Sequence, residues 1–393
     1  MRVLIVGAGI AGATLAYWLR RAGIEPTLVE RAPRWRDGGY ILDLWGAGFE
    51  VAERMGIVPR LMERGYRIAE VREVARSGRR IASVDPRRLI ASAGGRYVRI
   101  ARSDLAVIIR NAVAGEVETI FDDTVRELEN DGARVRVTFA HGAAREFDLV
   151  VGADGLHSSV RKLAFGPDRT FERDLGIGVA VFDLEGYEPR DELVAVTHTE
   201  VGAQVLRFTM RDGATMFSFI FRRDGDIPID DPAVQQELLR WRLRNMGWEV
   251  PAILARMPDA RSFYFDRASQ IRMPSWSLGR LALIGDAAAC PSLLAGQGSA
   301  LAMVEAYVLA AELSRSGGNH PAAFAAYETR LASVVRAKQD AAIGLAAAFA
   351  PRNRMQLLLR NTAVGLMGTP LIARLAMGRS LRDPIDLPPP PTG

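Results

Sequence analysis

A glycine-rich turn close to Met1 restricts the possible folds of this chain more than any other feature. The apolar run at 3–6 leads into Gly7, Gly9 and Gly12, which are spaced as G-x-G-x-x-G. In such a turn the first glycine permits a tight bend, the second lets a ligand approach the backbone, and the third lets a helix pack closely on the strand. Together with Ala11 inside the turn, the pattern predicts a buried strand followed by a helix.

A second apolar run, at 26–29, completes the unit and ends at Glu30. A carboxylate about 20 residues beyond the glycines can bond a ribose 2′-hydroxyl, and the start of the helix can bind a pyrophosphate. The unit therefore predicts a bound dinucleotide with an unphosphorylated ribose, as in FAD or NAD. Arg31, next to Glu30, is a further candidate for contact with the cofactor.

The composition excludes several other classes of protein. The 393 residues carry a net charge of +5, and 49% are hydrophobic and 25% charged, as in ordinary globular proteins. One cysteine, Cys290, and four scattered histidines give no disulfide or metal spacing, so no metal is expected. The basic residues form no long run, and therefore indicate no nucleic-acid partner. No apolar stretch reaches the roughly 20 residues of a membrane span, and no secretory signal precedes the first strand, so we expect a cytoplasmic protein.

Two more strand-to-turn patterns occur further along the chain, each an apolar run followed by an acid beside a glycine. The run at 147–151 precedes Asp154, and the run at 280–284 precedes Gly285 and Asp286. Beyond the second pattern, a helical stretch opens at Gly296, Gln297 and Gly298.

These three patterns, in this order, resemble those of the group A flavoprotein aromatic hydroxylases over most of residues 1–315, and the tetracycline-inactivating members most of all. The resemblance implies FAD as the cofactor and NADPH or NADH as a transient reductant without a fold of its own. It also implies that Asp286 bonds the ribityl chain, that Asp154 lies around the cofactor phosphates, and that the helix after Gln297 stabilises negative charge on the reduced flavin.

Three more residues receive roles from the same resemblance. Arg102 is similar to an arginine that contacts FAD in the family. The segment from Arg36 to Asp43 is similar to one whose arginine contacts NADPH and whose aspartate contacts FAD. The implied activity is hydroxylation of an aromatic or polyketide-like small molecule by oxygen transfer from a flavin C4a-hydroperoxide.

The chain also departs from the family pattern. Ala289 stands where many members have histidine, and Ser292 and Leu293 stand where many have a pair of prolines. This departure leaves open an FAD-dependent reductase or dehydrogenase on the same scaffold. A non-catalytic binding protein is a third alternative, against which the intact Glu30 and Asp286 argue. We expect Cys290 to behave as a small hydrophobe and His157 as a surface or packing residue.

The expected fold is α/β, with a Rossmann-type FAD-binding domain, an inserted, mostly antiparallel substrate sheet and C-terminal helices. The FAD-binding domain is predicted to comprise residues 1–70, 98–172 and 270–320, and the substrate-binding domain residues 71–97 and 173–269. Residues 321–393 are predicted to form the C-terminal helical segment and the proline-rich tail. We expect the tail to be exposed. Polar and apolar residues alternate at 175–224, which favours half-buried strands. The candidates for the pocket lining are Phe182, Phe208, Phe217 and Phe219, although core packing suits any one of them.

Overall fold

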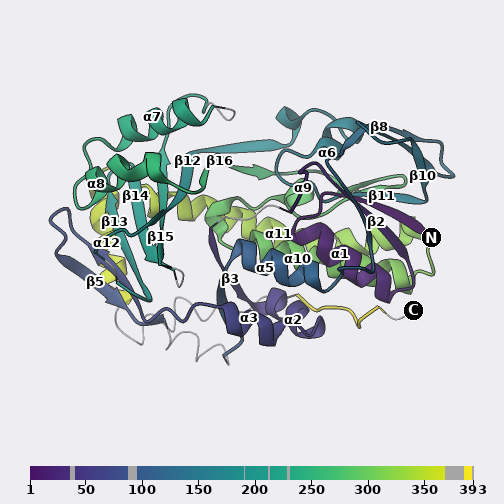
Figure 1. Ribbon diagram of the computed structural model, residues 1–393, viewed down its shortest axis with the longest axis horizontal. Coiled ribbons are helices and arrows are strands. Elements are labelled where there is room, and N and C mark those ends of the chain that lie inside the picture. Colours follow the sequence, from purple (N-terminus) through teal and green to yellow (C-terminus); the bar gives the residue numbers. More distant parts are fainter. Residues whose placement is uncertain are drawn as a thin grey trace.

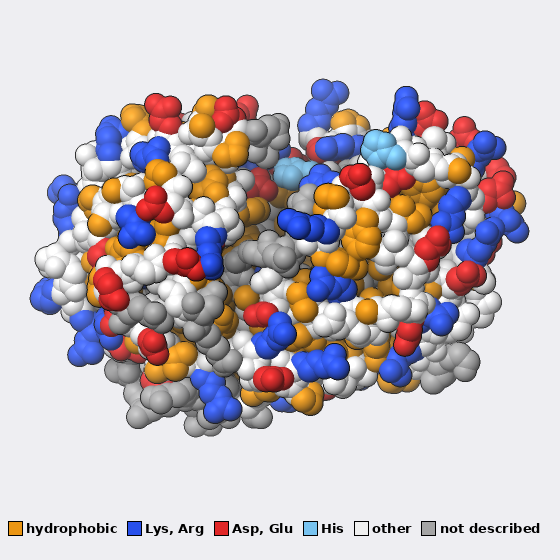
Figure 2. Space-filling model, in the orientation of Figure 1, with side chains coloured by type: hydrophobic (Ala, Val, Ile, Leu, Met, Phe, Trp, Pro, Cys, Tyr) orange, Lys and Arg blue, Asp and Glu red, His pale blue; other side chains and the backbone are white. Residues whose placement is uncertain are grey.

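The computed structural model describes residues 1–35, 40–86, 95–189, 191–210, 213–227, 231–367 and 385–391. They form two lobes, each built on its own large sheet, with long helices running between them (Figure 1). On the face shown in Figure 2, Lys and Arg side chains are scattered among Asp and Glu over both lobes.

The first lobe contains a six-stranded sheet in the order β17-β18-β11-β1-β2-β7, parallel except for the pair β17–β18. Its strands are β1 (Arg2–Val6), β2 (Glu25–Glu30), β7 (Glu118–Phe121), β11 (Leu149–Gly152), β17 (Ser277–Leu278) and β18 (Leu281–Leu283). Because β1, β11 and β18 are parallel neighbours, the three turns that follow them meet at one edge of the sheet. The three sequence patterns are thereby brought together.

Helices and two smaller sheets surround this sheet. Helix α1 (Ile10–Arg21) packs along α10 (Gly298–Arg315), which is mostly apolar and almost wholly buried, as is typical of a helix inside a core. The other helices of the lobe are α2 (Gly46–Arg54), α3 (Val58–Arg64), α5 (Arg102–Asn111), α6 (Ser159–Ala164) and the short α9 (Asp286–Ala289). The smaller sheets pair β3 (Ile41–Trp45) with β6 (Tyr97–Ala101), and β9 (Val135–Phe139) with both β8 (Val125–Asn130) and β10 (Arg145–Phe147).

The second lobe is a seven-stranded sheet in the order β16-β12-β15-β14-β13-β4-β5, antiparallel except for the pair β13–β4. Its strands are β4 (Glu70–Val74), β5 (Arg80–Val84), β12 (Glu172–Glu185), β13 (Val194–Glu200), β14 (Ala203–Thr209), β15 (Ala214–Arg222) and β16 (Phe263–Ile271). Most of it lies between β11 and β18 in the chain. The α/β fold with an inserted, mostly antiparallel sheet is therefore confirmed.

Alternation along the strands gives the seven-stranded sheet two different apolar faces. The outer face carries Phe182, Phe217 and Phe219, which pack under α7 (Pro232–Leu243) and α8 (Val250–Arg256). The inner face carries Val181 and Phe208, which pack with residues of the first lobe and of the long helix α11 (His320–Phe349).

The proline-rich tail is docked on the first lobe and only partly exposed: Pro388 and Pro391 are buried, whereas Pro389 and Pro390 are exposed as expected from the sequence. Leu387 is buried in the core of the first lobe. The carbonyl oxygen of Pro388 accepts hydrogen bonds from the Tyr307 hydroxyl at 2.5 Å and from the Arg54 guanidinium at 2.6 Å. A proline carbonyl remains an acceptor although the residue has no N–H, so the tail can be bound without forming a helix or strand.

The last described helix, α12 (Arg354–Met367), follows α11 and contacts β5. None of the helices in the described part of the chain combines the length and apolar character that crossing a membrane requires.

Candidate functional site

The glycine-rich turn leaves backbone N–H groups open beside the edge where the three turns meet. A Cβ at Gly7 would lie 2.6 Å from the oxygen of Ala153, and one at Gly12 would lie 1.9 Å from the oxygen of Gly7, so both positions require glycine. A Cβ at Gly9 would meet nothing within 4 Å. Gly9 caps α1 without a side-chain hydrogen bond, and no acid stands in the first turn. Such an uncapped, uncharged helix start is suited to binding a phosphate.

Glu30 is held beside this turn by two backbone donors. Its carboxylate accepts hydrogen bonds from the N–H of Ala8 and of Ala32, both at 3.0 Å. A carboxylate has about four acceptor positions, so lone pairs are left for the hydroxyls of a ribose. The neighbouring Arg31 is exposed.

Asp154 caps α6. Its carboxylate accepts hydrogen bonds from the Ser158 hydroxyl at 2.5 Å, from the N–H and hydroxyl of Ser159 at 2.7 Å each, and from the N–H of Val160 at 3.2 Å. A Cβ at Gly7 would lie 2.9 Å from the Cα of Asp154, so this turn packs directly on the glycine-rich one. The structure thus gives Asp154 a capping role, and its contact with cofactor phosphates stays a prediction.

Arg161 connects the second and third turns, a role that no sequence pattern indicated. Its side chain is fully buried and donates hydrogen bonds to the carbonyl oxygens of Ala287 and Leu156, at 2.9 and 2.6 Å, and to Asp168 at 2.7 Å. The position of Arg161 soon after Asp154 is visible in the sequence, but its partner Ala287 is far away along the chain.

Asp286 lies at the centre of a group of polar side chains from three segments. Burial raises the pKa of the Asp286 carboxyl, and the hydrogen bond to Cys290 and the positive charge of Arg102 oppose that rise. Burial also raises the pKa of the Tyr40 phenol to about 12, against the effect of Arg102. The backbone N–H of Arg102 donates to the backbone carbonyl oxygen of Tyr40 at 3.0 Å, which ties α5 to the segment before β3. The predicted candidates Arg102 and Asp286 are therefore neighbours.

Cys290 belongs to the same group but has the properties of a buried, neutral thiol. Burial raises its pKa well above the ordinary value, and the charge of Asp286 adds to the rise. Its sulfur lies 3.7 Å from the carbonyl oxygen of Ser269. Since the thiolate is the reactive form, this environment disfavours redox or nucleophilic chemistry at Cys290.

The start of α10 faces the same edge. Gly296 adopts a left-handed conformation, and Gln297 caps α10 without a side-chain hydrogen bond to its backbone. A Cβ at Gly298 would lie 3.6 Å from Oδ1 of Asp286. This second uncapped helix start therefore lies beside the carboxylate, and the contact of Gln297 and Gly298 with the flavin stays a prediction.

Asp43 has different surroundings from the candidates above. Asp43, on β3, is paired with Arg99 on β6, through a 2.7 Å contact to its Oδ2 and a second contact to its Oδ1, and it also accepts from the Tyr97 hydroxyl. Its contact with FAD stays a prediction. Arg36 lies outside the described residues.

The four candidate pocket phenylalanines do not form one group. Phe208 lies on the inner face of the seven-stranded sheet, where its ring packs edge-on against Tyr66. Phe182, Phe217 and Phe219 are fully buried on the outer face under α7 and α8, and there they are core residues. The strand alternation separates the two sets, which revises the expectation for these three.

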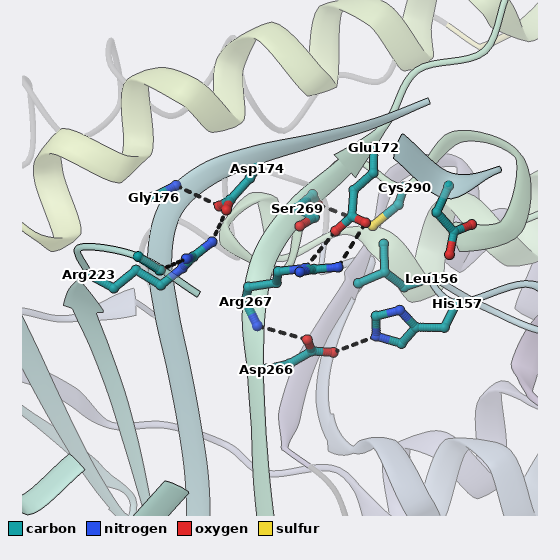
Figure 3. A network of polar contacts seen from close by, with 12 residues as sticks. Leu156, His157, Glu172, Asp174, Gly176, Arg223, Asp266, Arg267, Ser269 and Cys290 are labelled. Carbon is teal, nitrogen blue, oxygen red and sulfur yellow. Dashed lines mark hydrogen bonds and ion pairs between the residues drawn. The ribbon is translucent and has the colours of Figure 1, made fainter. Parts of the chain in front are cut away.

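His157 reaches across from the first lobe to the second. Its Nε2 lies 3.4 Å from Oδ2 of Asp266 on β16, and the same oxygen accepts from the Tyr264 hydroxyl at 3.3 Å. Figure 3 shows the imidazole of His157 turned toward Asp266, and Arg267 as the next residue on β16. Arg267 makes two hydrogen bonds to Glu172, at 2.8 and 3.0 Å. His157 is therefore a contact between the lobes, which the sequence could not reveal because its partner lies on a distant strand.

Among the described residues, no three His, Cys, Asp or Glu side chains are grouped as a metal ion would require. The groups that the three turns do bring together are backbone donors and carboxylates.

The comparisons with known proteins agree with this geometry. A family model described as an FAD binding domain matches residues 1–342. A flavin-dependent monooxygenase of Legionella longbeachae is 33% identical over 399 residues, covering 99% of this chain and 98% of the relative. An uncharacterized protein of Mycobacterium tuberculosis is 37% identical over 340 residues, covering 86% and 91%.

Two solved structures extend the comparison. The tetracycline destructase Tet(55) superposes with a TM-score of 0.84 at 32% identity, covering 98% of each chain. HpxO of Klebsiella pneumoniae, complexed with FAD and uric acid, has a TM-score of 0.81 at 22% identity, covering 97% of this chain and 96% of that one. The second of these likenesses concerns the fold alone.

Proposed function

The chain belongs to the FAD-binding family of flavin-dependent monooxygenases, and on that premise we propose that it uses NADPH or NADH and O2 to hydroxylate an aromatic or polyketide-like small molecule. FAD is its cofactor. The finer assignment of the substrate depends mainly on one observation: the apolar inner face of the second lobe adjoins the segment that leads into α10.

The residues present fit FAD. The two uncapped helix starts, the open space at Gly9 and the free acceptor positions of Glu30 match a pyrophosphate, a flavin edge and a ribose. In the proposed arrangement α1 holds the pyrophosphate, Glu30 the ribose, Asp286 the ribityl chain and the start of α10 the flavin ring. Bound FAD supplies the electron transfer and the oxygen activation.

The inner face supplies an apolar floor for the substrate. Val181, Phe208 and Met216 from three strands pack in one cluster with Leu294, which lies in the short turn Leu293–Ala295 shortly before the start of α10. An aromatic ring system placed here would be shielded from water beside the flavin, and exclusion of water protects reactive oxygen species from side reactions.

The same face ends in polar groups at β4. By strand register, Glu73 stands on the inner face, where Arg360 of α12 lies 2.7 Å from its Oε1 and the Thr197 hydroxyl donates to its Oε2 at 2.6 Å. An apolar floor with polar groups at one end favours a ring system that carries oxygen substituents. This chemistry supports the polyketide-like class within the proposal.

The proposal is tested by product mass. Tetracycline and other polycyclic phenols are screened for acceleration of NADPH oxidation. The mass of the product formed from each stimulating compound is then measured by mass spectrometry. We expect a gain of one oxygen atom with matching O2 consumption. A gain of two hydrogens without O2 uptake would instead show a reductase, and no stimulation by any polycyclic phenol would reject the substrate class.

The assignment of Asp286 has its own test. Asp286→Ala removes the carboxylate proposed to bond the ribityl chain, and loss of a hydrogen bond to a charged group costs about 1.5–3 kcal/mol. We therefore expect FAD to bind at least about tenfold more weakly, measured by quenching of flavin fluorescence. Unchanged affinity in a folded variant would remove Asp286 from the cofactor site.

A further inference from the structure

Glu305 is a carboxyl group buried inside the first lobe, and the proposed mechanism makes no use of it. It lies on α10 with no solvent exposure. Its Oε2 accepts a hydrogen bond from the backbone N–H of Gly285, and the Tyr327 hydroxyl of α11 lies 3.5 Å from the same oxygen. Within the described part of the chain, Oε1 has no partner and no Arg or Lys forms an ion pair with Glu305.

The backbone that Glu305 contacts is the turn that carries Asp286. Gly285 has a φ of +63°, which a residue with a side chain adopts only with strain. A Cβ there would also lie 3.2 Å from the Cβ of Ala11 in the glycine-rich turn. The hydrogen bond from Gly285 to Glu305 therefore fixes an unusual backbone conformation between the two parts of the cofactor site.

The surroundings of Glu305 favour its neutral form. Its titratable neighbours are Asp286 and Tyr327, and neither brings a positive charge. An ionised carboxylate would be buried without a cation and beside a second carboxylate, which is costly in a medium of low dielectric constant. Burial, reinforced by the charge of Asp286, accordingly raises the pKa of Glu305 well above its ordinary value.

We propose that Glu305, as a neutral carboxylic acid, is a positioning residue for FAD: it holds the Gly285 turn so that Asp286 presents its carboxylate to the cofactor. The inference rests on FAD binding and is independent of the substrate. The two acids of this site then have different roles: the neutral Glu305 supports the backbone of the turn, and Asp286 contacts the cofactor.

The protonation state is tested by comparing the unfolding of the wild type and Glu305→Gln without FAD. Above the ordinary pKa of 4.5, the unfolded chain releases a proton that folded Glu305 retains. Wild-type stability must therefore fall with rising pH relative to the glutamine variant, which does not titrate. We expect the midpoint of thermal unfolding of Glu305→Gln to rise relative to the wild type between pH 5 and about pH 8. If the difference between the two unfolding midpoints stays constant, or if the midpoint of Glu305→Gln falls relative to the wild type as the pH rises, Glu305 is ionised in the folded protein.

The matched control is Glu312→Gln, further along the same helix. Glu312 is buried like Glu305, but it is paired with Arg315 and Arg330 at 3.4 and 3.2 Å. Removing this charge leaves two guanidinium groups without their partner, so we expect no gain in relative stability with rising pH. A gain equal to that of Glu305→Gln would overturn the assignment, since the effect would then not depend on the absence of a cation.

The positioning role is tested by the dissociation constant of FAD. Glutamine retains an acceptor for the Gly285 N–H, so Glu305→Gln should bind FAD within about threefold of the wild type. Glu305→Leu leaves that N–H without an acceptor, and we expect at least about tenfold weaker binding by the folded protein. If Glu305→Leu folds and binds FAD normally, the residue serves only packing. If it does not fold, a tenfold loss of affinity in Glu305→Gln with normal stability would equally refute the proposal.

Discussion

At the scale of single residues, the acids of this site have different functions although the sequence shows only similar acid–glycine pairs. Asp154 and Asp286 both follow a buried strand next to a glycine. In the structure, Asp154 bonds the start of α6 with four contacts, while Asp286 lies beside Arg102 and Cys290. Local sequence predicts the turn, because strand and glycine are neighbours along the chain. It cannot predict the partners, which come from other segments.

Removing the Asp154 cap should weaken the fold and, through the turn packed on Gly7, the cofactor site. Asp154→Ala is expected to cost about 1 kcal/mol of unfolding free energy, measured by urea denaturation. Asp231→Ala is the matched control, because Asp231 caps α7 in the other lobe through the N–H groups of Ala233 and Val234. We expect similar losses of stability, but weaker FAD binding only in Asp154→Ala. Equal FAD affinities would confine Asp154 to capping.

At the scale of elements, polar–apolar alternation predicted β12 to β15 of the second lobe, but not which face of that sheet meets the first lobe. On β12, Val181 and Phe182 point to opposite faces, and both are apolar. A strand buried on both sides has no polar face to mark the outside, so periodicity alone cannot assign the pocket. The helices α7 and α8, placed on the outer face, decide the question.

The two faces should respond differently to the same substitution. Phe208→Leu, on the inner face, should raise the substrate concentration needed for half-maximal NADPH oxidation. Phe182→Leu, on the outer face, should lower stability by about 1–3 kcal/mol, in the range of ordinary core substitutions, without altering that concentration. Stability is measured by urea denaturation, and the half-saturating concentration is measured from initial rates with the same stimulating phenol for both variants. A shift in half-saturation caused by Phe182→Leu alone would reverse the assignment of the faces.

At the scale of the whole molecule, the two lobes are joined by contacts that no single sequence motif encodes. Helix α11 contacts both α10 and β12, His157 meets Asp266, and the tail docks on α2 and α10. The three turns of the first lobe could be predicted because each is formed by residues that are consecutive in the sequence. The contacts between the lobes and with the tail could not be predicted, since each depends on two segments that are distant in the sequence and become neighbours only after folding.

The docked tail should contribute measurably to stability. Leu387 is 7% exposed and packs in the core of the first lobe, so Leu387→Ala is expected to cost about 2 kcal/mol or more. Cleavage of the tail in limited proteolysis should become correspondingly faster. Met355→Ala is the control, because Met355 on α12 is 65% exposed and should cost little. Equal costs for the two variants would mean that the tail is not held in solution.

The order of strands in the first sheet has a consequence for how the protein is made. Strand β1 pairs with β11, and β11 pairs with β18, which leaves the ribosome only after the whole seven-stranded sheet has been synthesised. The turn bearing Asp286 and the helix α10 emerge later still. Since chains begin to fold from the amino-terminal side during synthesis, the second lobe can form before the first lobe is complete. Loading of the flavin is therefore a late event in biosynthesis, and nascent chains halted before β18 should remain colourless.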